Sequence, residues 1–302
     1  MFPRVPDQHK PNKPLVLNGL GVFYVLASVV YLFFMFYYNV VNISNGGSEA
    51  VGIPVVKAAP LILAVCILFG GFLGMLDDWV DLRWRYKAFL PLIAAIPLVS
   101  FAFALPGLRT SVMLPFVGTI DFGVYYYLII LPLLVTVITN TVNQLGGLNG
   151  LETVCPAVVL VGLMVMSGSE AVYLYVPLVA WLVLAVLNFQ GRIFVGNTGS
   201  FAMGMTVASF AVISNLKVNL VVSVLPYIFN SVLILLTFFF ARKKASVSFD
   251  GKRLFSDHRR SLITLLTYRR ALTERQVVLL ISLLVAATTL LAVAMRLLFL
   301  PK

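Results

Sequence analysis

Charged residues are scarce in this sequence. Only 11% of its 302 residues are Asp, Glu, Lys or Arg, and 61% are hydrophobic, whereas soluble domains carry about 25% charged residues. The mean hydropathy of +1.01 agrees with this bias. The composition excludes a soluble globular protein and places most of the chain in lipid.

Cysteine is also almost absent. Cys66 and Cys155 are the two cysteines of the sequence, and they form neither a disulfide framework nor a metal-ligand spacing. We expect both to be packing residues. The polar and basic residues 1–14 contain no short apolar core with a cleavage site, so we expect no signal peptide, and the first span itself directs insertion.

Long apolar runs predict the fold class, because a spanning helix needs about 20 mostly apolar residues. The runs lie near residues 15–40, 56–76, 88–105, 122–142, 153–167, 171–188, 199–214, 218–240 and 276–300. We therefore predict an all-α, polytopic helical membrane protein with about nine to ten transmembrane helices. It forms one membrane-embedded domain over residues 1–302.

The basic residues predict the orientation. If the N-terminus is cytoplasmic, 17 of the 22 Lys and Arg residues fall on the cytoplasmic side, ten of them in residues 242–275. The positive-inside rule favours this arrangement. The net charge of +11 therefore needs no nucleic-acid partner. We predict cytoplasmic catalytic segments near residues 7–21, 77–87, 140–152, 191–200 and 241–275.

Three carboxylates meet at the end of one apolar run. Asp77, Asp78 and Asp81 directly follow residues 61–76. Carboxylates at the end of a span are costly unless they are paired or solvated. Mg²⁺ bound to a substrate phosphate needs one or two of them plus waters, so the cluster suits a metal–diphosphate site. A hydrated helix end, with Asp81 offsetting a basic neighbour, is the alternative.

Amide side chains form the second cluster. Asn140 and Asn143 are three residues apart and share a helix face, and Asn149 and Glu152 follow after a glycine-rich stretch. Amides can donate to phosphate oxygens, offer a carbonyl to a metal or contact a base edge. Amide-mediated helix packing is the alternative.

Two further segments carry phosphate-binding signals. The small-residue turn at 194–200 precedes a span, and backbone N–H groups before a helix attract phosphate, although such turns are often only conformational. The basic loop 242–275 contains His258, Arg259 and Arg260. It suits either an anchor on anionic lipids or a clamp on the diphosphate of a nucleotide-sugar.

Read in order, these segments resemble the polyprenyl-phosphate N-acetylhexosamine-1-phosphate transferases, which are of the glycosyltransferase family 4 type. The most similar branch makes N-acetylglucosamine-diphosphodolichol for N-glycosylation. The resemblance covers nearly the whole chain and rests on two long motifs. These are Leu76-Asp77-Asp78 leading through Leu82-Arg83-Trp84-Arg85 to Lys87, and Asn140-x-x-Asn143 running to Gly147-x-Asn149-Gly150-Leu151-Glu152.

The resemblance implies roles for individual residues. Asp77 and Asp78 form the catalytic pair, with Asp78 holding either the metal or Lys87. Asn149 lies at the uracil-contacting position, and His258 faces the donor diphosphate. The full set of candidates is catalytic Asp77, Asp78, Lys87 and His258; substrate-binding Lys10, Asn140, Asn149, Glu152, Arg259 and Arg260; and metal-binding Asn143, Asn197 and Asp81.

Two positions depart from the family pattern in opposite directions. Asn197 stands where the family usually has a metal-binding Asp, and Asp81 stands where the most similar branch commonly has Asn. We hypothesise that this exchange conserves the local number of acidic groups. Asn149 and a single histidine in the last loop also distinguish the chain from the peptidoglycan branch, which has aspartates and a run of histidines there.

The resemblance implies transfer of N-acetylglucosamine-1-phosphate, or a related HexNAc-1-phosphate, from a UDP-sugar to a polyprenyl or dolichyl phosphate, with release of UMP. The expected cofactor is Mg²⁺, with Mn²⁺ as an alternative. Membrane lipids are the other expected partners, a homodimer is left open, and the expected location is the cell membrane. The rival hypotheses are a UbiA-type intramembrane prenyltransferase, which would need a second Asp-rich motif, and an inactive or transport homologue.

Overall fold

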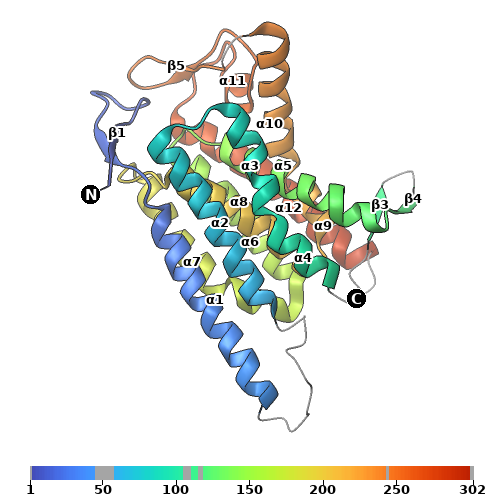
Figure 1. Ribbon diagram of the computed structural model, residues 1–302. Coiled ribbons are helices and arrows are strands. Elements are labelled where there is room, and N and C mark those ends of the chain that lie inside the picture. Colours follow the sequence, from blue (N-terminus) through green and yellow to red (C-terminus); the bar gives the residue numbers. More distant parts are fainter. Residues whose placement is uncertain (1, 45–57, 105–109, 115–117, 243–244, 300–302) are drawn as a thin grey trace.

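The computed structural model describes residues 2–44, 58–104, 110–114, 118–242 and 245–299. Within these residues the chain is a bundle of helices (Figure 1). The strands among them form three two-stranded hairpins: β1 (Arg4–Pro6) with β2 (Leu15–Leu17), β3 (Ser111–Leu114) with β4 (Gly118–Asp121), and β5 (Ser248–Phe249) with β6 (Leu254–Phe255). The predicted all-α membrane fold is confirmed.

The helices follow the apolar runs of the sequence closely. In the first half of the chain they are α1 (Gly21–Ser44), α2 (Ala59–Val80), α3 (Trp84–Ala94), α4 (Ile96–Ala104), η2 (Tyr126–Ile130) and α5 (Leu131–Gln144). In the second half they are α6 (Leu151–Ser167), η3 (Gly168–Leu174), α7 (Tyr175–Phe189), α8 (Gly196–Ile213), α9 (Lys217–Ser223), α10 (Leu225–Leu236), η4 (Thr237–Ala241), α11 (Leu262–Leu266) and α12 (Glu274–Phe299).

The number of membrane spans differs from the prediction. Six helical segments of the described residues are long and apolar enough to cross a membrane, and a seventh results if α9 and α10, bent by 63°, count as one. The predicted runs at 153–167 and 171–188 form α6 and α7, which are separated by a break at Gly168 (φ 63°, ψ −125°) and by η3 and which pack against each other, although the stretch Leu151–Phe189 is one of the six segments. The predicted first run, 15–40, begins as strand β2, and its helix starts only at Gly21. The multi-pass character is confirmed, and the count of nine to ten is not.

Helix α8 occupies the centre of the bundle. It packs against α1, α2, α5 and α6, and every residue from Thr198 to Ile213 is buried. Small side chains permit this close packing. A Cβ on Gly74 of α2 would lie 2.1 Å from the Asn197 carbonyl oxygen, and one on Gly21 would lie 2.2 Å from the Gly199 Cα. The N-terminal turn of α8 is thereby held directly against α1 and α2.

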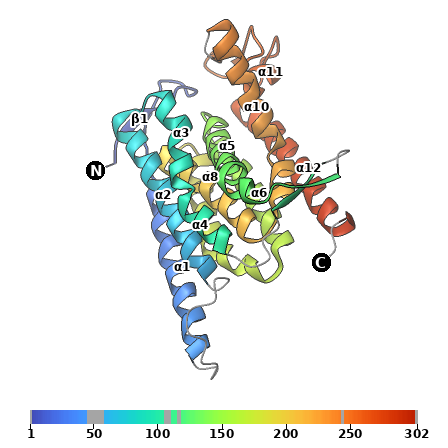
Figure 2. The ribbon, with the colours of Figure 1, turned by 45° about the vertical axis from the view of Figure 1, so that its right-hand side comes forward.

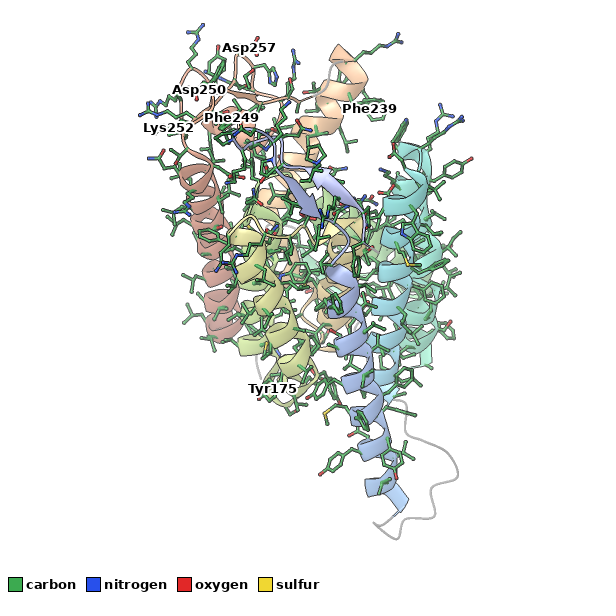
Figure 3. All side chains as sticks on the ribbon, turned by 90° about the vertical axis from the view of Figure 1, so that its left-hand side faces the viewer. Tyr175, Phe239, Phe249, Asp250, Lys252 and Asp257 are labelled. Atoms are coloured by element: carbon green, nitrogen blue, oxygen red, sulfur yellow. The ribbon has the colours of Figure 1, made fainter. Side chains whose placement is uncertain are left out.

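The predicted catalytic segments gather at one end of the bundle. β1, the C-terminal end of α2, the β5–β6 hairpin and α11 all lie there (Figure 1). Figure 2 shows α10 extending to this end, where α11 also lies, and the Asn230 side chain of α10 accepts a hydrogen bond from the Leu262 backbone N–H of α11 at 2.9 Å. Asp250, Lys252 and Asp257 are at the same end in Figure 3, whereas Tyr175 is near the other.

Candidate active site

Asp77 is buried at the C-terminal end of α2 and holds a cation. Its Oδ1 lies 2.8 Å from Lys87 Nζ of α3 and accepts the backbone N–H of Leu82 at 3.0 Å. Its Oδ2 is buried, and no described protein group donates a hydrogen bond to it. A buried carboxylate oxygen without a partner is costly. Asp77 is therefore a fixed group with one acceptor available for a proton, a cation or a substrate hydroxyl.

Asp78, the next residue, has a different role. Its Oδ1 accepts the backbone N–H of Asn197 at 2.9 Å, and its Oδ2 accepts the backbone N–H and the Oγ1–H of Thr198 at 2.9 and 2.7 Å. A carboxylate at this position satisfies orphan amides and interacts favourably with the helix dipole. Asp78 therefore caps the N-terminus of α8 from the neighbouring helix.

This cap corrects two expectations from the sequence. The Asn197 and Thr198 amides of the 194–200 turn donate to Asp78, so they are already used and do not offer an empty phosphate cradle. Lys87 pairs with Asp77 and Asp81, at 2.8 and 3.5 Å, and not with Asp78. The physical reason is that adjacent side chains on a helix point about 100° apart.

The three predicted metal-binding residues surround the same helix end in different ways. Asn143 Oδ1 accepts the hydroxyl of Ser200 at 2.9 Å, which joins α5 to α8. Asn197 lies in the first turn of α8. Asp81 ends α2 with a left-handed backbone (φ 47°), and its side chain is 98% exposed beside Lys87. Asn143 is thus connected through the Ser200 hydroxyl to the first turn of α8, which contains Asn197, while the exposed Asp81 lies beside Lys87.

The described residues contain no group of three or more His, Cys, Asp or Glu side chains that would hold a metal by themselves. Mg²⁺ needs no such cage, because it keeps waters and uses one or two carboxylates together with substrate phosphates. The unpartnered Oδ2 of Asp77 and the carbonyl of Asn143, which has a second lone pair, are oxygen ligands of the required kind. These residues fit a substrate-bound Mg²⁺.

Two other candidates lie close to this centre. Asn140 donates through Nδ2 to the carbonyl of Thr136 at 2.9 Å and of Ala88 at 3.4 Å, so its amide joins α5 to α3. These contacts match the alternative considered for the amide cluster, in which the amides serve helix packing. Glu152 begins α6 next to Gly146, within electrostatic range of Asp78.

A second polar cluster holds the N-terminal segment on the bundle. Asn149 is buried and donates through Nδ2 to Asp7 Oδ2 at 2.7 Å and to Glu274 Oε1 at 3.1 Å, while its backbone N–H donates to Glu274 Oε1 at 2.7 Å. Lys10 pairs with the other oxygen of Glu274 at 2.5 Å. Lys10 and Asn149, both predicted to bind substrate, therefore both contact Glu274.

The basic residues of the last loop have different surroundings. The His258 side chain is largely buried, its Nδ1 accepts or donates no hydrogen bond among the described residues, and its Nε2 is 4.0 Å from Asp257. Arg259 stacks over the ring of Tyr268 at 4.2 Å. The Arg260 backbone N–H donates to the Thr264 hydroxyl at 2.8 Å. At the tip of the β5–β6 hairpin, the Arg253 and Lys252 amides lower the pKa of Asp250.

Three residues of these clusters were not among the predicted site residues. Asp7 and Glu274 contact Asn149, and Asn188 accepts the Gly150 N–H at 2.8 Å and the Thr153 hydroxyl at 3.1 Å while donating to the Ile193 carbonyl at 2.9 Å. The sequence gives a weak signal for two of them, because Asp7 and Glu274 lie in the predicted catalytic segments 7–21 and 241–275. Asn188 carries no such signal.

The comparisons with known proteins show the family of this chain. A model of glycosyl transferase family 4 matches residues 60–215, which include α2, α5 and the N-terminal turn of α8. A protein of Saccharolobus solfataricus, named as a UDP-N-acetylglucosamine–dolichyl-phosphate N-acetylglucosaminephosphotransferase, is 28% identical over 289 residues, or 91% of this chain and 82% of its own.

Yeast and bacteria also contain relatives. The Saccharomyces cerevisiae protein of the same name is 28% identical over 266 residues, which are 74% of this chain and 58% of the yeast protein. A phospho-N-acetylmuramoyl-pentapeptide-transferase of Clostridium perfringens is 28% identical over 250 residues, or 78% of this chain and 71% of the relative. Since the family model covers more than half of the residues, the chain belongs to glycosyl transferase family 4.

Proposed function

We propose that this membrane protein transfers N-acetylglucosamine-1-phosphate, or a related HexNAc-1-phosphate, from a UDP-sugar to a polyprenyl or dolichyl phosphate. The named relatives support this choice, since their names give UDP-N-acetylglucosamine as donor and dolichyl phosphate as acceptor. The observation that carries the proposal is the pair Asp77 and Lys87. Lys87 Nζ holds Oδ1 of the buried Asp77 carboxylate at 2.8 Å, and Oδ2 of the same carboxylate is left without a partner among the described residues.

In the proposed reaction a phosphate oxygen of the lipid attacks the β-phosphorus of the UDP-sugar. The new O–P bond forms as the bond from that phosphorus to the α-phosphate oxygen breaks, and UMP leaves. An acceptor phosphate is already anionic near neutral pH. Asp77 Oδ2 therefore needs only to orient it or to remove its second proton. Lys87 keeps the Asp77 side chain fixed for this purpose.

Catalysis in such a transfer comes mostly from positioning and from neutralising charge. Asp78 contributes by fixing the first turn of α8, which carries Asn197, against α2. A bound Mg²⁺, or Mn²⁺ in its place, would offset charge on the diphosphate oxygens and on leaving UMP. Asn143, Asn197 and Asp81 would hold it, and His258, Arg259 and Arg260 would supply the cationic side of the donor site.

The orientation and the membrane are part of the proposal. The end of the bundle that carries the site also carries β1, α3 and the described part of the basic loop, residues 245–275 (Figure 1). The positive-inside rule therefore favours a cytoplasmic site in the cell membrane.

The test is UMP release by the purified protein with UDP-N-acetylglucosamine, a polyprenyl phosphate and Mg²⁺. We expect UMP to form only when the lipid acceptor is present, and Asp77→Asn to abolish its formation. Asp121→Asn, at the exposed β3–β4 hairpin, is the matched control and should keep full activity. Absence of UMP with every UDP-HexNAc donor and lipid tested would favour the inactive or transport homologue instead.

A further inference from the structure

The side-chain amide of Asn149 is held by two carboxylates from distant parts of the chain. Its Nδ2 donates to Asp7 Oδ2 at 2.7 Å and to Glu274 Oε1 at 3.1 Å. All three residues are more than nine-tenths buried. Carboxylate oxygens only accept hydrogen bonds, so the NH₂ group must face them. The reverse orientation would press the amide oxygen against two carboxylate oxygens.

Both carboxylates are themselves fixed by the N-terminal segment. The second oxygen of Asp7 accepts the backbone N–H of His9 at 3.2 Å, and the second oxygen of Glu274 binds Lys10 Nζ at 2.5 Å. The backbone N–H of Asn149 also donates to Glu274, at 2.7 Å. Neither carboxylate can turn away without losing these contacts, so the orientation of the amide is set by its surroundings.

The remaining polar atom of this side chain has no partner. Asn149 Oδ1 is buried, and no described protein group donates a hydrogen bond to it. Buried carbonyl oxygens are almost always satisfied in native proteins. The two carboxylates thus leave Asn149 with one unused function, which is to accept a hydrogen bond.

We infer that Asp7 and Glu274 are positioning residues, which orient Asn149 so that its Oδ1 accepts an N–H group of the donor substrate. The inference rests on the proposed function, in which the donor is a UDP-N-acetylhexosamine. That molecule offers two such groups, the imide N–H of uracil and the acetamide N–H of the sugar. Cytosine presents an acceptor in place of the imide N–H, and a glucose donor lacks the acetamide.

The experiment compares kcat/KM for UDP-N-acetylglucosamine, CDP-N-acetylglucosamine and UDP-glucose in the wild type and in the double variant Asp7→Asn/Glu274→Gln. The new amides can donate as well as accept, so the Asn149 amide becomes free to turn over. We expect the preference for the correct N–H group to fall about tenfold, the size of one lost hydrogen bond. The matched control is Asp121→Asn/Glu170→Gln, with the same chemical changes at sites on other elements.

The two arms identify the group that Asn149 contacts. A fall in the UDP-over-CDP preference assigns Oδ1 to the base, and a fall in the preference over UDP-glucose assigns it to the acetamide. Unchanged preferences in a folded double variant that has only lost activity would overturn the inference, because a merely structural role predicts that result. If the double variant does not fold, Asp7→Asn alone, which keeps the Lys10–Glu274 pair, must show the same change at smaller size.

Binding of UMP and CMP, measured by calorimetry without turnover, separates this inference from the proposed function. If the wild type releases no UMP yet prefers UMP to CMP, and the double variant loses that preference, the proposed reaction fails and the positioning role stands. If turnover is normal and neither preference responds to the double variant, the positioning role fails and the proposed reaction stands.

Discussion

Asp78 and Thr198 are joined by two hydrogen bonds to one carboxylate oxygen. The backbone N–H and the hydroxyl of Thr198 both donate to Asp78 Oδ2, at 2.9 and 2.7 Å. This contact joins the C-terminal end of α2 to the first turn of α8, the helix at the centre of the bundle. Asp78 therefore fixes the position of α8 against α2, while Asp77 retains an oxygen without a partner among the described residues.

The contact predicts a graded loss of stability at position 198. Thr198→Val keeps the backbone hydrogen bond and removes the hydroxyl one, so it should lower the free energy of unfolding by about 1 kcal/mol. Thr198→Ser keeps both and is the matched control. Thermal unfolding in detergent measures the difference, and equal melting temperatures for the two variants would contradict the capping role.

The different contacts of Asp77 and Asp78 give a second prediction. Asp78→Asn removes the charge that caps α8 and should destabilise the protein by about 1–3 kcal/mol. Asp77→Asn keeps an acceptor for Leu82 and Lys87, and Lys87 still has Asp81 as an ion-pair partner at 3.5 Å, so it should abolish activity with little loss of stability. Melting temperature and UMP release are measured on both. Equal destabilisation by the two variants would contradict this difference in role.

Lys87 gives a third prediction, because it is placed between two carboxylates. Its Nζ lies 2.8 Å from Asp77 and 3.5 Å from Asp81. Lys87→Met leaves these negative charges without their cation and should lower kcat by at least about tenfold. Lys87→Arg should retain more activity. Lys13→Met, in an exposed part of the N-terminal segment, controls for loss of a positive charge, and an equal effect there would argue against a specific role.

The sequence predicts the segments that make up the site much better than the contacts within it. Asp77 and Asp78 are adjacent, and only the packing of α2 against α8 decides which of them caps the helix. Asp7 and Glu274 are 142 and 125 residues from Asn149, so no local pattern connects them. The predicted span at 199–214 is not among the six apolar segments for a related reason, since α8 is buried by other helices and contains small and polar residues in place of a lipid-facing apolar surface.

Asn188 gives a prediction about the loop that carries Asn149. Its buried side chain makes three hydrogen bonds, to the Gly150 N–H, the Thr153 hydroxyl and the Ile193 carbonyl. Asn188→Ala leaves these groups unsatisfied and should cost at least about 2 kcal/mol. Asn219→Ala is a suitable comparison, because that buried amide donates one hydrogen bond, to the Ala292 carbonyl at 2.9 Å. Thermal unfolding should rank Asn188→Ala as the more damaging change.

The exchange of Asn197 and Asp81 gives the last prediction. Both flank the centre formed by Asp77 and Lys87, and Asp81 contacts Lys87 directly at 3.5 Å. If activity depends on the number of acidic groups around the proposed Mg²⁺, Asn197→Asp and Asp81→Asn each change that number by one and should each lower activity. The double variant restores the number of acidic groups, so it should recover activity at the Mg²⁺ concentration that supports the wild type. Losses that simply multiply in the double variant would show that the two positions act independently.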